Sequence, residues 1–162
     1  MDTEKLTTMS RDAVTTAVRL ALTEGNPTAE PVHLLHAMLM VPENSVGPLL
    51  TGVGADPARI DAEAQRAVKR LPSTSGSSVS QPQLSGSFAR VMADAENRAD
   101  RMGDQYVSTE HLLIALASVP GEAQTILTGA GVSADGLEKA FNDGRGERRI
   151  TSPEAEGGES AL

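Results

Sequence analysis

Apolar residues recur every three or four positions along most of the chain, the spacing that places them on one face of a helix. The first such stripe lies between Thr8 and Glu24 and ends at Gly25. A glycine at this point commonly ends a helix by adopting the left-handed conformation. The pattern therefore predicts an amphipathic helix that begins near Thr8 and ends at Gly25.

The first half of the chain shows three further helical patterns. One begins at Glu30-Pro31 and ends before Pro42, and it is apolar nearly all round, which is typical of a buried helix. A shorter one extends from Ser45 to Val53. The fourth begins at Asp56-Pro57, where a capping residue precedes a proline in the first turn, and it reaches Leu71.

The second half repeats this order of four helices. The patterns cover 84–102, 110–119, 121–130 and a last helix that Ser133 caps and that reaches Asp143. Nowhere in the chain do apolar and polar residues alternate convincingly with period two, so the sequence predicts no strands. The predicted fold is all-α, with eight helices.

The two halves are copies of one supersecondary unit. His33-Leu34-Leu35 matches His111-Leu112-Leu113 at an offset of 78, and at the same offset Gly25 falls on Gly103. After a one-residue deletion the offset is 77, and Gly54 meets Gly131. Matches that keep their order across a whole segment indicate an internal repeat. We therefore expect two four-helix repeats related by a pseudo-two-fold axis.

Composition places the boundaries of these repeats. The first repeat covers about 6–71 and the second about 84–144, within one domain of residues 1–144. Between them, 72–83 is rich in Ser, Thr, Gly and Pro, a composition typical of a flexible connector. Residues 145–162 lack apolar periodicity, so we expect a flexible linker there, with Arg145, Arg148 and Arg149 in solvent.

Charge and cysteine content narrow the function classes. The net charge is −8, from 14 Lys and Arg against 22 Asp and Glu, which argues against a nucleic-acid partner. The absence of cysteine excludes disulfides and thiol nucleophiles. No signal peptide follows Met1, and the longest apolar stretch, 34–41, is far shorter than a membrane span needs. We expect a cytoplasmic protein without a membrane partner.

Two motifs in the repeats carry a family resemblance. Glu-Pro-Val-His-Leu-Leu at 30–35 and Tyr-Val-Ser-Thr-Glu-His-Leu-Leu at 106–113 resemble the Clp N-terminal domain, which precedes the ATPase rings of Hsp100 unfoldases. Pro-Leu-Leu-Thr-Gly-Val-Gly at 48–54, Arg-Leu-Pro at 70–72, Gln-Pro-Gln-Leu at 81–84 and Ile-Thr-Ser-Pro-Glu at 150–154 are most similar to the ClpB disaggregases. The resemblance covers about residues 4–154.

The resemblance implies a non-catalytic substrate-recognition domain of a disaggregase. Such a domain binds exposed segments of unfolded or aggregated proteins and passes them to the ATPase pore. The chain contains no Gly-x-x-x-x-Gly-Lys-Ser/Thr loop, so ATP and Mg would belong to a missing ATPase ring, and we expect no cofactor here. By resemblance the parent protein is a hexamer that works with an Hsp70-type chaperone system. The isolated domain is expected to be a monomer.

Three candidate substrate-binding residues come from the same resemblance. A threonine of the first helix and two acidic residues of the second repeat fall by motif on Thr7, Asp104 and Glu110. Thr7 and Glu110 also have purely structural explanations. Thr7 could cap the first helix, and Glu110 could complement the dipole of the sixth. An apolar groove formed by Phe88, Val91 and Met92 is also possible, although a small domain needs such residues in its core.

Other functions stay open at this point. The chain could be an adaptor-docking or phosphoarginine-reading domain of a ClpC-like protease unfoldase, or a stand-alone Clp-N protein. ClpC-like domains carry Thr-Glu-His in both repeats, whereas only 109–111 does so here and 31–33 reads Pro-Val-His. Glu30, His33 and His36 have the spacing of a metal-binding helix face, but no third ligand set is evident. We expect no metal site.

Overall fold

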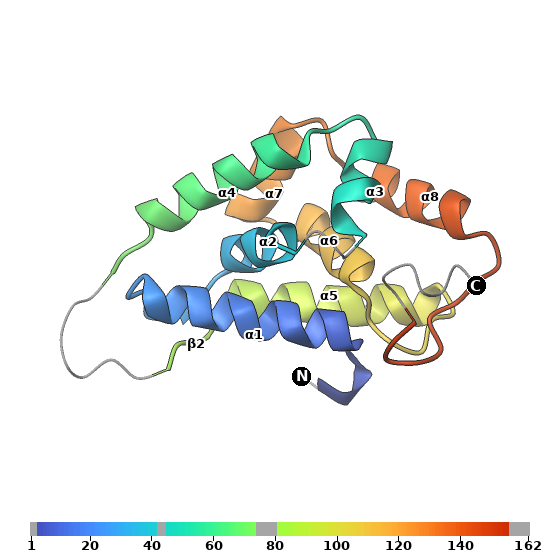
Figure 1. Ribbon diagram of the computed structural model, residues 1–162, viewed down its shortest axis with the longest axis horizontal. Coiled ribbons are helices and arrows are strands. Elements are labelled where there is room, and N and C mark those ends of the chain that lie inside the picture. Colours follow the sequence, from blue (N-terminus) through green and yellow to red (C-terminus); the bar gives the residue numbers. More distant parts are fainter. Residues whose placement is uncertain (1–2, 42–44, 74–80, 156–162) are drawn as a thin grey trace.

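The computed structural model describes residues 3–41, 45–73 and 81–155. Over this part of the chain it confirms the all-α prediction with eight α-helices (Figure 1). The elements are η1, a short 3-10 helix (Thr3–Lys5), α1 (Thr8–Thr23), β1 (Thr28–Ala29), α2 (Pro31–Leu39), α3 (Val46–Gly52), α4 (Pro57–Arg70), β2 (Gln83–Leu84), α5 (Gly86–Arg101), α6 (Thr109–Ser118), α7 (Glu122–Gly129) and α8 (Ala134–Arg145).

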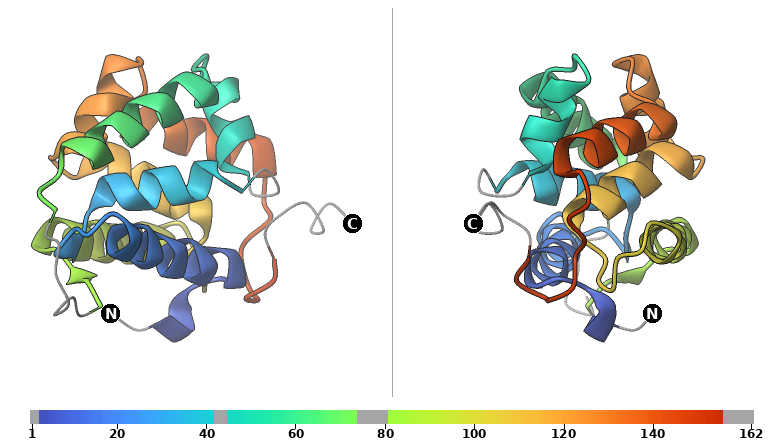
Figure 2. Two further views of the ribbon diagram at one scale, coloured as in Figure 1. Left: turned by 60° about the vertical axis from the view of Figure 1, so that its left-hand side comes forward. Right: turned by 90° about the vertical axis from the view of Figure 1, so that its right-hand side faces the viewer.

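The helices lie in three tiers. Helices α1 and α5 lie side by side at one side of the molecule, α2 and α6 form the middle, and α3, α4, α7 and α8 cover the other side (Figures 1 and 2). The two middle helices are the most apolar, which is why they lie between the other tiers. In α6, every residue from Thr109 to Ala117 is buried.

Short backbone pairings join the two repeats across their pseudo-two-fold axis. Ala29 of β1 pairs in parallel with Leu84 of β2, and Leu6 forms the matching bridge to Val107. These are the same two positions with the repeats exchanged, since Leu6 matches Leu84 and Ala29 matches Val107 at the repeat offset of 78. The prediction of no strands is therefore wrong for β1 and β2. Two residues are too short for a period-two pattern to be visible.

The prediction that glycines end the helices is confirmed. Gly25 and Gly103 end α1 and α5 with φ of 74° and 82°, and Gly54 and Gly131 have φ of 87° and 82°. A residue without Cβ adopts this conformation readily. The pairs that the repeat matched in sequence thus make the same turn in space.

The chain after α8 departs from the expectation of a flexible linker. Residues 146–155, called the strap below, run back from α8 to the N-terminal end of α1 (red in Figure 2). The amide of Gln105 donates to the carbonyl of Ile150 at 2.8 Å, and the amide of Thr8 donates to that of Pro153 at 2.9 Å. The expectation does not hold for residues 145–155. Residues 156–162, like 74–80 of the predicted connector, lie outside the described part.

Within the described ranges no single helix is long and apolar enough to cross a membrane. Among the helices that the structure describes, α6 and α7 taken together have the length and composition, and they meet at an angle of 92°.

Candidate functional site

Asp104 lies at the centre of a buried polar network. It follows Gly103 at the end of α5, and its side chain is fully buried. One carboxylate oxygen accepts from Nε2 of His111 at 2.9 Å. The other accepts from Nη1 of Arg145 and from the amide of Ile150, both at 2.7 Å. Asp104 therefore ties the loop before α6 to α6 itself, to α8 and to the strap.

The orientation of His111 follows from its second ring nitrogen. Nδ1 accepts from the amide of Ser108 at 2.9 Å, so the neutral ring carries its proton on Nε2 and donates it to Asp104. The ring meets Phe141 edge to face, with centroids 5.5 Å apart. The guanidinium of Arg145 lies over the same Phe141 ring at 4.2 Å. The network is thus enclosed by an aromatic side chain as well as by hydrogen bonds.

The charge on Asp104 is strongly stabilised. Burial alone would raise the pKa of this carboxyl group, but the hydrogen bonds from His111, Arg145 and the Ile150 amide outweigh it and lower the pKa to about 2. Asp104 is therefore ionised at neutral pH and pairs with Arg145. Arg145 itself is only 8% exposed, and its Nε and Nη2 have no hydrogen-bond partner among the described residues. The expectation that Arg145 lies in solvent is wrong.

The first repeat contains an uncharged version of this network. Nε2 of His33 hydrogen-bonds to Oδ1 of Asn26 at 2.8 Å, and Nδ1 accepts from the amide of Glu30 at 2.8 Å. Nδ2 of Asn26 donates to the carbonyl of Pro72, just after α4, at 2.8 Å. Burial lowers the pKa of His33, which keeps the ring neutral. In both repeats the histidine and its partner hold the chain that follows the fourth helix.

Thr7 caps α1. Its Oγ1 accepts from the amide of Ser10 at 3.1 Å and donates to the Ser10 hydroxyl at 3.0 Å, and the residue is fully buried. Ser85 has the same role at α5, where Oγ accepts from the amide of Phe88 at 3.0 Å. Because the equivalent residue of the other repeat does the same, the structural role accounts for Thr7 in this conformation.

Glu110 breaks the symmetry of the repeats. It lies in the first turn of α6 and is 9% exposed. Oε2 accepts from the hydroxyl of Ser45, while Oε1 is buried and has no hydrogen-bond partner in the described part of the chain. The equivalent residue of the first repeat is Val32, which is buried in the core. A carboxylate thus stands where the other repeat has an apolar side chain.

The structure brings together two of the three predicted substrate residues. Thr7 and Asp104 lie at the two ends of one short stretch of the strap, since Thr8 binds Pro153 and Asp104 binds Ile150. Glu110 contacts Ser45 at the start of α3 instead.

The proposed groove residues belong to the core. Phe88 is fully buried, and Val91 and Met92 are each 1% exposed. They form the inner face of α5 and pack against the other apolar side chains of the core. The expectation of a groove formed by these three residues is therefore not met in this conformation, because none presents its side chain to solvent.

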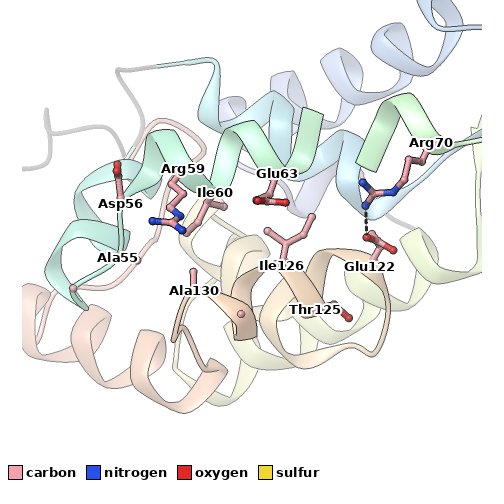
Figure 3. A pocket seen from close by; sticks show the side chains of 12 residues that line it. Ala55, Asp56, Arg59, Ile60, Glu63, Arg70, Glu122, Thr125, Ile126 and Ala130 are labelled. Atoms are coloured by element: carbon pink, nitrogen blue, oxygen red, sulfur yellow. Dashed lines mark hydrogen bonds and ion pairs between the residues drawn. The ribbon is translucent and has the colours of Figure 1, made fainter. Parts of the chain in front are cut away.

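An open cavity of about 550 Å³ lies elsewhere, between α4 and α7. Ile60, Ile126 and Ala130 point into it, with the charged side chains of Arg59 and Glu63 along α4 (Figure 3). An ion pair between Arg70 and Glu122, 2.9 Å long, closes one end. The predicted site residues do not line this cavity.

The residues considered for a metal site are used in other contacts. His33 binds Asn26, and Nδ1 of His36 lies 2.6 Å from Oδ1 of Asp61. Glu30 accepts from the hydroxyl of Thr28 at 2.6 Å. Across the described ranges no three His, Asp or Glu side chains come together in a way that could hold a metal ion.

Comparison with known families agrees with this geometry. The family model of the Clp repeat (R) N-terminal domain matches residues 5–130. The chain belongs to the Clp N-terminal domain family. This Clp N-terminal domain is 74% identical over its full length to the chaperone protein ClpB of Propionibacterium freudenreichii, and it spans 19% of that protein. The chain therefore covers about a fifth of the length of this curated relative.

Solved structures show the same fold. The Hsp104 N-terminal domain of Candida albicans superposes with a TM-score of 0.81 at 23% identity, covering 94% of this chain and 99% of that one. A ClpV N-domain solved in complex with a VipB peptide gives a TM-score of 0.66 at 17% identity, with 86% of each chain covered.

Sequence reasoning missed three residues of the network in this Clp N-terminal domain. Asn26 could have been found, because it falls on Asp104 at the repeat offset and both can bind a histidine. Arg145 and Ile150 gave no comparable signal, since they lie at and beyond the end of the last helical pattern.

Proposed function

We propose that this chain is the non-catalytic substrate-recognition domain of a ClpB-like protein disaggregase. It binds exposed segments of unfolded or aggregated proteins and passes them to an ATPase ring. The observation that carries the proposal is the 74% identity to a ClpB chaperone over the full length of the chain. A domain of the same fold, that of ClpV, has been solved with a bound peptide, which supports peptide recognition by this fold.

The remaining parts of the machine belong to the rest of a longer protein. ATP, Mg and the hexameric ring would be supplied there, and an Hsp70-type chaperone system would deliver clients in the cytoplasm. The domain's own contribution is to bind a client and hold it at a high effective concentration near the pore. Holding many different clients requires weak binding that tolerates different sequences, and it requires no catalytic residues.

The predicted residues contribute to client binding in two ways. Glu110 has a buried carboxylate oxygen without a partner in the described structure, so a cationic or N–H group of a client would satisfy it once the first turn of α6 opens to admit that group. Thr7 acts within the fold by capping α1, which holds the backbone of Thr8 in place. Asp104 holds the loop before α6, and one of its carboxylate oxygens accepts from a main-chain amide. We therefore propose that recognition takes place at the N-terminal end of α1, the loop before α6 and the first turn of α6.

The proposal is tested by titrating the ¹⁵N-labelled chain with a destabilised, unfolded variant of a small protein, using the folded wild-type form of that protein as the control. Saturable chemical-shift changes around Thr8, Gln105 and Glu110 with the unfolded form alone are expected. Unchanged spectra at millimolar unfolded polypeptide, or equal changes with the folded form, would overturn the proposal.

A further inference from the structure

The strap is bound to the rest of the domain in the way that a peptide is bound by a receptor. Both main-chain groups of Ile150 are paired, the amide with Oδ1 of Asp104 at 2.7 Å and the carbonyl with the amide of Gln105 at 2.8 Å. The Ile150 side chain is 9% exposed. Three residues further on, the carbonyl of Pro153 accepts from the amide of Thr8 at 2.9 Å. One aliphatic side chain and three main-chain hydrogen bonds therefore hold this segment.

We propose that Thr8, Asp104 and Gln105 form a receptor for a non-helical chain segment with one aliphatic side chain, and that the strap occupies it in cis. The receptor is called the seam below. This inference rests on the proposed function and deepens it, because it names the client-binding site and the segment that regulates it. A client segment binds when it displaces residues 149–153.

The chemistry of the seam fits an unfolded client. It recognises main-chain N–H and C=O groups, which every extended chain has, and side-chain specificity is limited to one buried aliphatic residue. An unfolded protein exposes both features together, whereas a folded protein has its main-chain groups paired and its aliphatic residues buried. The seam therefore distinguishes unfolded from folded chains without reading a sequence.

The strap can leave without dismantling the seam. Residues 147–149, 151 and 154 are exposed, so few contacts oppose its release. Asp104 keeps its hydrogen bonds to His111 and Arg145, which belong to α6 and α8 and not to the strap. The acceptor for an incoming N–H group thus stays charged and correctly placed.

The first repeat lacks an equivalent receptor in its described part. There the side chain of Asn26 donates a hydrogen bond to the carbonyl of Pro72. In the second repeat the charged side chain of Asp104 instead accepts one from the Ile150 amide. The amide of Ser85, which corresponds to Thr7, donates to Ala29 in the other repeat, as Thr7 donates to Val107. The difference between the repeats lies in Asp104 and in the chain that it holds.

The test is a peptide exchange in trans on the full chain. Ile150→Ser removes the aliphatic anchor of the strap and leaves Asp104 intact, and Thr151→Ala, at an exposed neighbouring residue, is the matched control. The probe is a synthetic peptide of residues 147–155 with blocked termini, compared with the same peptide carrying Ser in place of Ile. Hydrogen exchange of the Thr8 and Gln105 amides is followed by NMR.

We expect Ile150→Ser to speed exchange of both amides at least tenfold, and the isoleucine peptide to restore their protection while the serine peptide does not. The wild-type chain should bind the isoleucine peptide at least tenfold more weakly, because its own strap competes at a high effective concentration. Unchanged protection in a folded Ile150→Ser chain, or no rescue at millimolar peptide, would overturn the proposal. If Ile150→Ser does not fold, Ile150→Ala takes its place. Client binding in the titration above together with failure here would leave the proposed function standing and remove only the seam.

Discussion

Asn26 and Asp104 occupy the same place in the two repeats, and each hydrogen-bonds to Nε2 of the histidine seven residues later, at 2.8 and 2.9 Å. Each follows a glycine with positive φ that ends a helix. The amide in the first repeat holds Pro72, and the carboxylate in the second holds Ile150 and Arg145. The domain thus uses the same polar pair twice, as Asn26 with His33 and as Asp104 with His111. The pair contains a charged residue only in the second repeat, where it binds the strap.

Asp104→Asn should destabilise the domain. Nδ1 of His111 already accepts from the Ser108 amide, so Nε2 must donate, and an asparagine has only one oxygen for His111, Arg145 and Ile150. Leaving the buried Arg145 charge uncompensated is expected to lower the free energy of unfolding by about 3 kcal/mol. Urea denaturation measures this. Asp61→Asn, which replaces the partly exposed partner of His36, is the control and should cost under about 1 kcal/mol. Equal losses of unfolding free energy in the two variants would contradict the role of Asp104 in holding Arg145 and Ile150.

Thr7→Ala and Ser85→Ala should have matching effects on stability. Each removes a side-chain cap from an equivalent helix, and the loss of such a cap costs about 1 kcal/mol. Thr7→Ser keeps the cap and should be nearly neutral. Thermal unfolding of the three variants provides the measurement. If Thr7→Ala left stability unchanged and abolished client binding, Thr7 would be a client contact and not a cap.

Glu110→Val places the residue of the first repeat at the equivalent position of the second. The carboxylate is buried and only one of its oxygens is paired, so its replacement by an apolar side chain should change the free energy of unfolding by less than about 1 kcal/mol. Affinity for an unfolded polypeptide should nevertheless fall, because the oxygen proposed to bind the client is removed. A stable variant with wild-type affinity would exclude Glu110 from recognition.

The free energy of unfolding should decrease at low pH as Asp104 becomes protonated. Its pKa in the folded chain is about 2, below the ordinary value of 3.8. Because the folded state holds the carboxylate ionised, its contribution of about 2 kcal/mol is fully present above about pH 4 and is lost as the pH falls through 2. The ¹³C shift of the Asp104 carboxyl carbon gives the midpoint directly. A midpoint at or above 3.8 would contradict the buried network.

Most of the helical architecture could be predicted from the sequence, because helices of 7 to 16 residues carry enough periodic positions to be recognised. The glycines at 25, 54, 103 and 131 marked their ends through a conformation that other residues rarely adopt. Strands β1 and β2 could not be found, since their pairing depends on contacts between repeats and not on local pattern.

The candidate site was less predictable. Motif resemblance selected Thr7, Asp104 and Glu110, but it could not show that Thr7 and Asp104 are fully engaged within the fold. The strap was mistaken for a linker because its docking depends on a single apolar residue, Ile150, and on main-chain groups that have no sequence signature. Arg145 was taken for a solvent-exposed residue because nothing in the sequence places it beside Asp104.

The most direct test of the account is the hydrogen exchange of three amides in the wild-type chain while an unfolded polypeptide is added. If the client displaces the strap, the Ile150 amide should lose its protection in a saturable manner, while the Thr8 and Gln105 amides stay protected because the client takes over their hydrogen bonds. Binding of the polypeptide with Ile150 still fully protected would show that clients are captured elsewhere, and would contradict the assignment of the seam as the client-binding site.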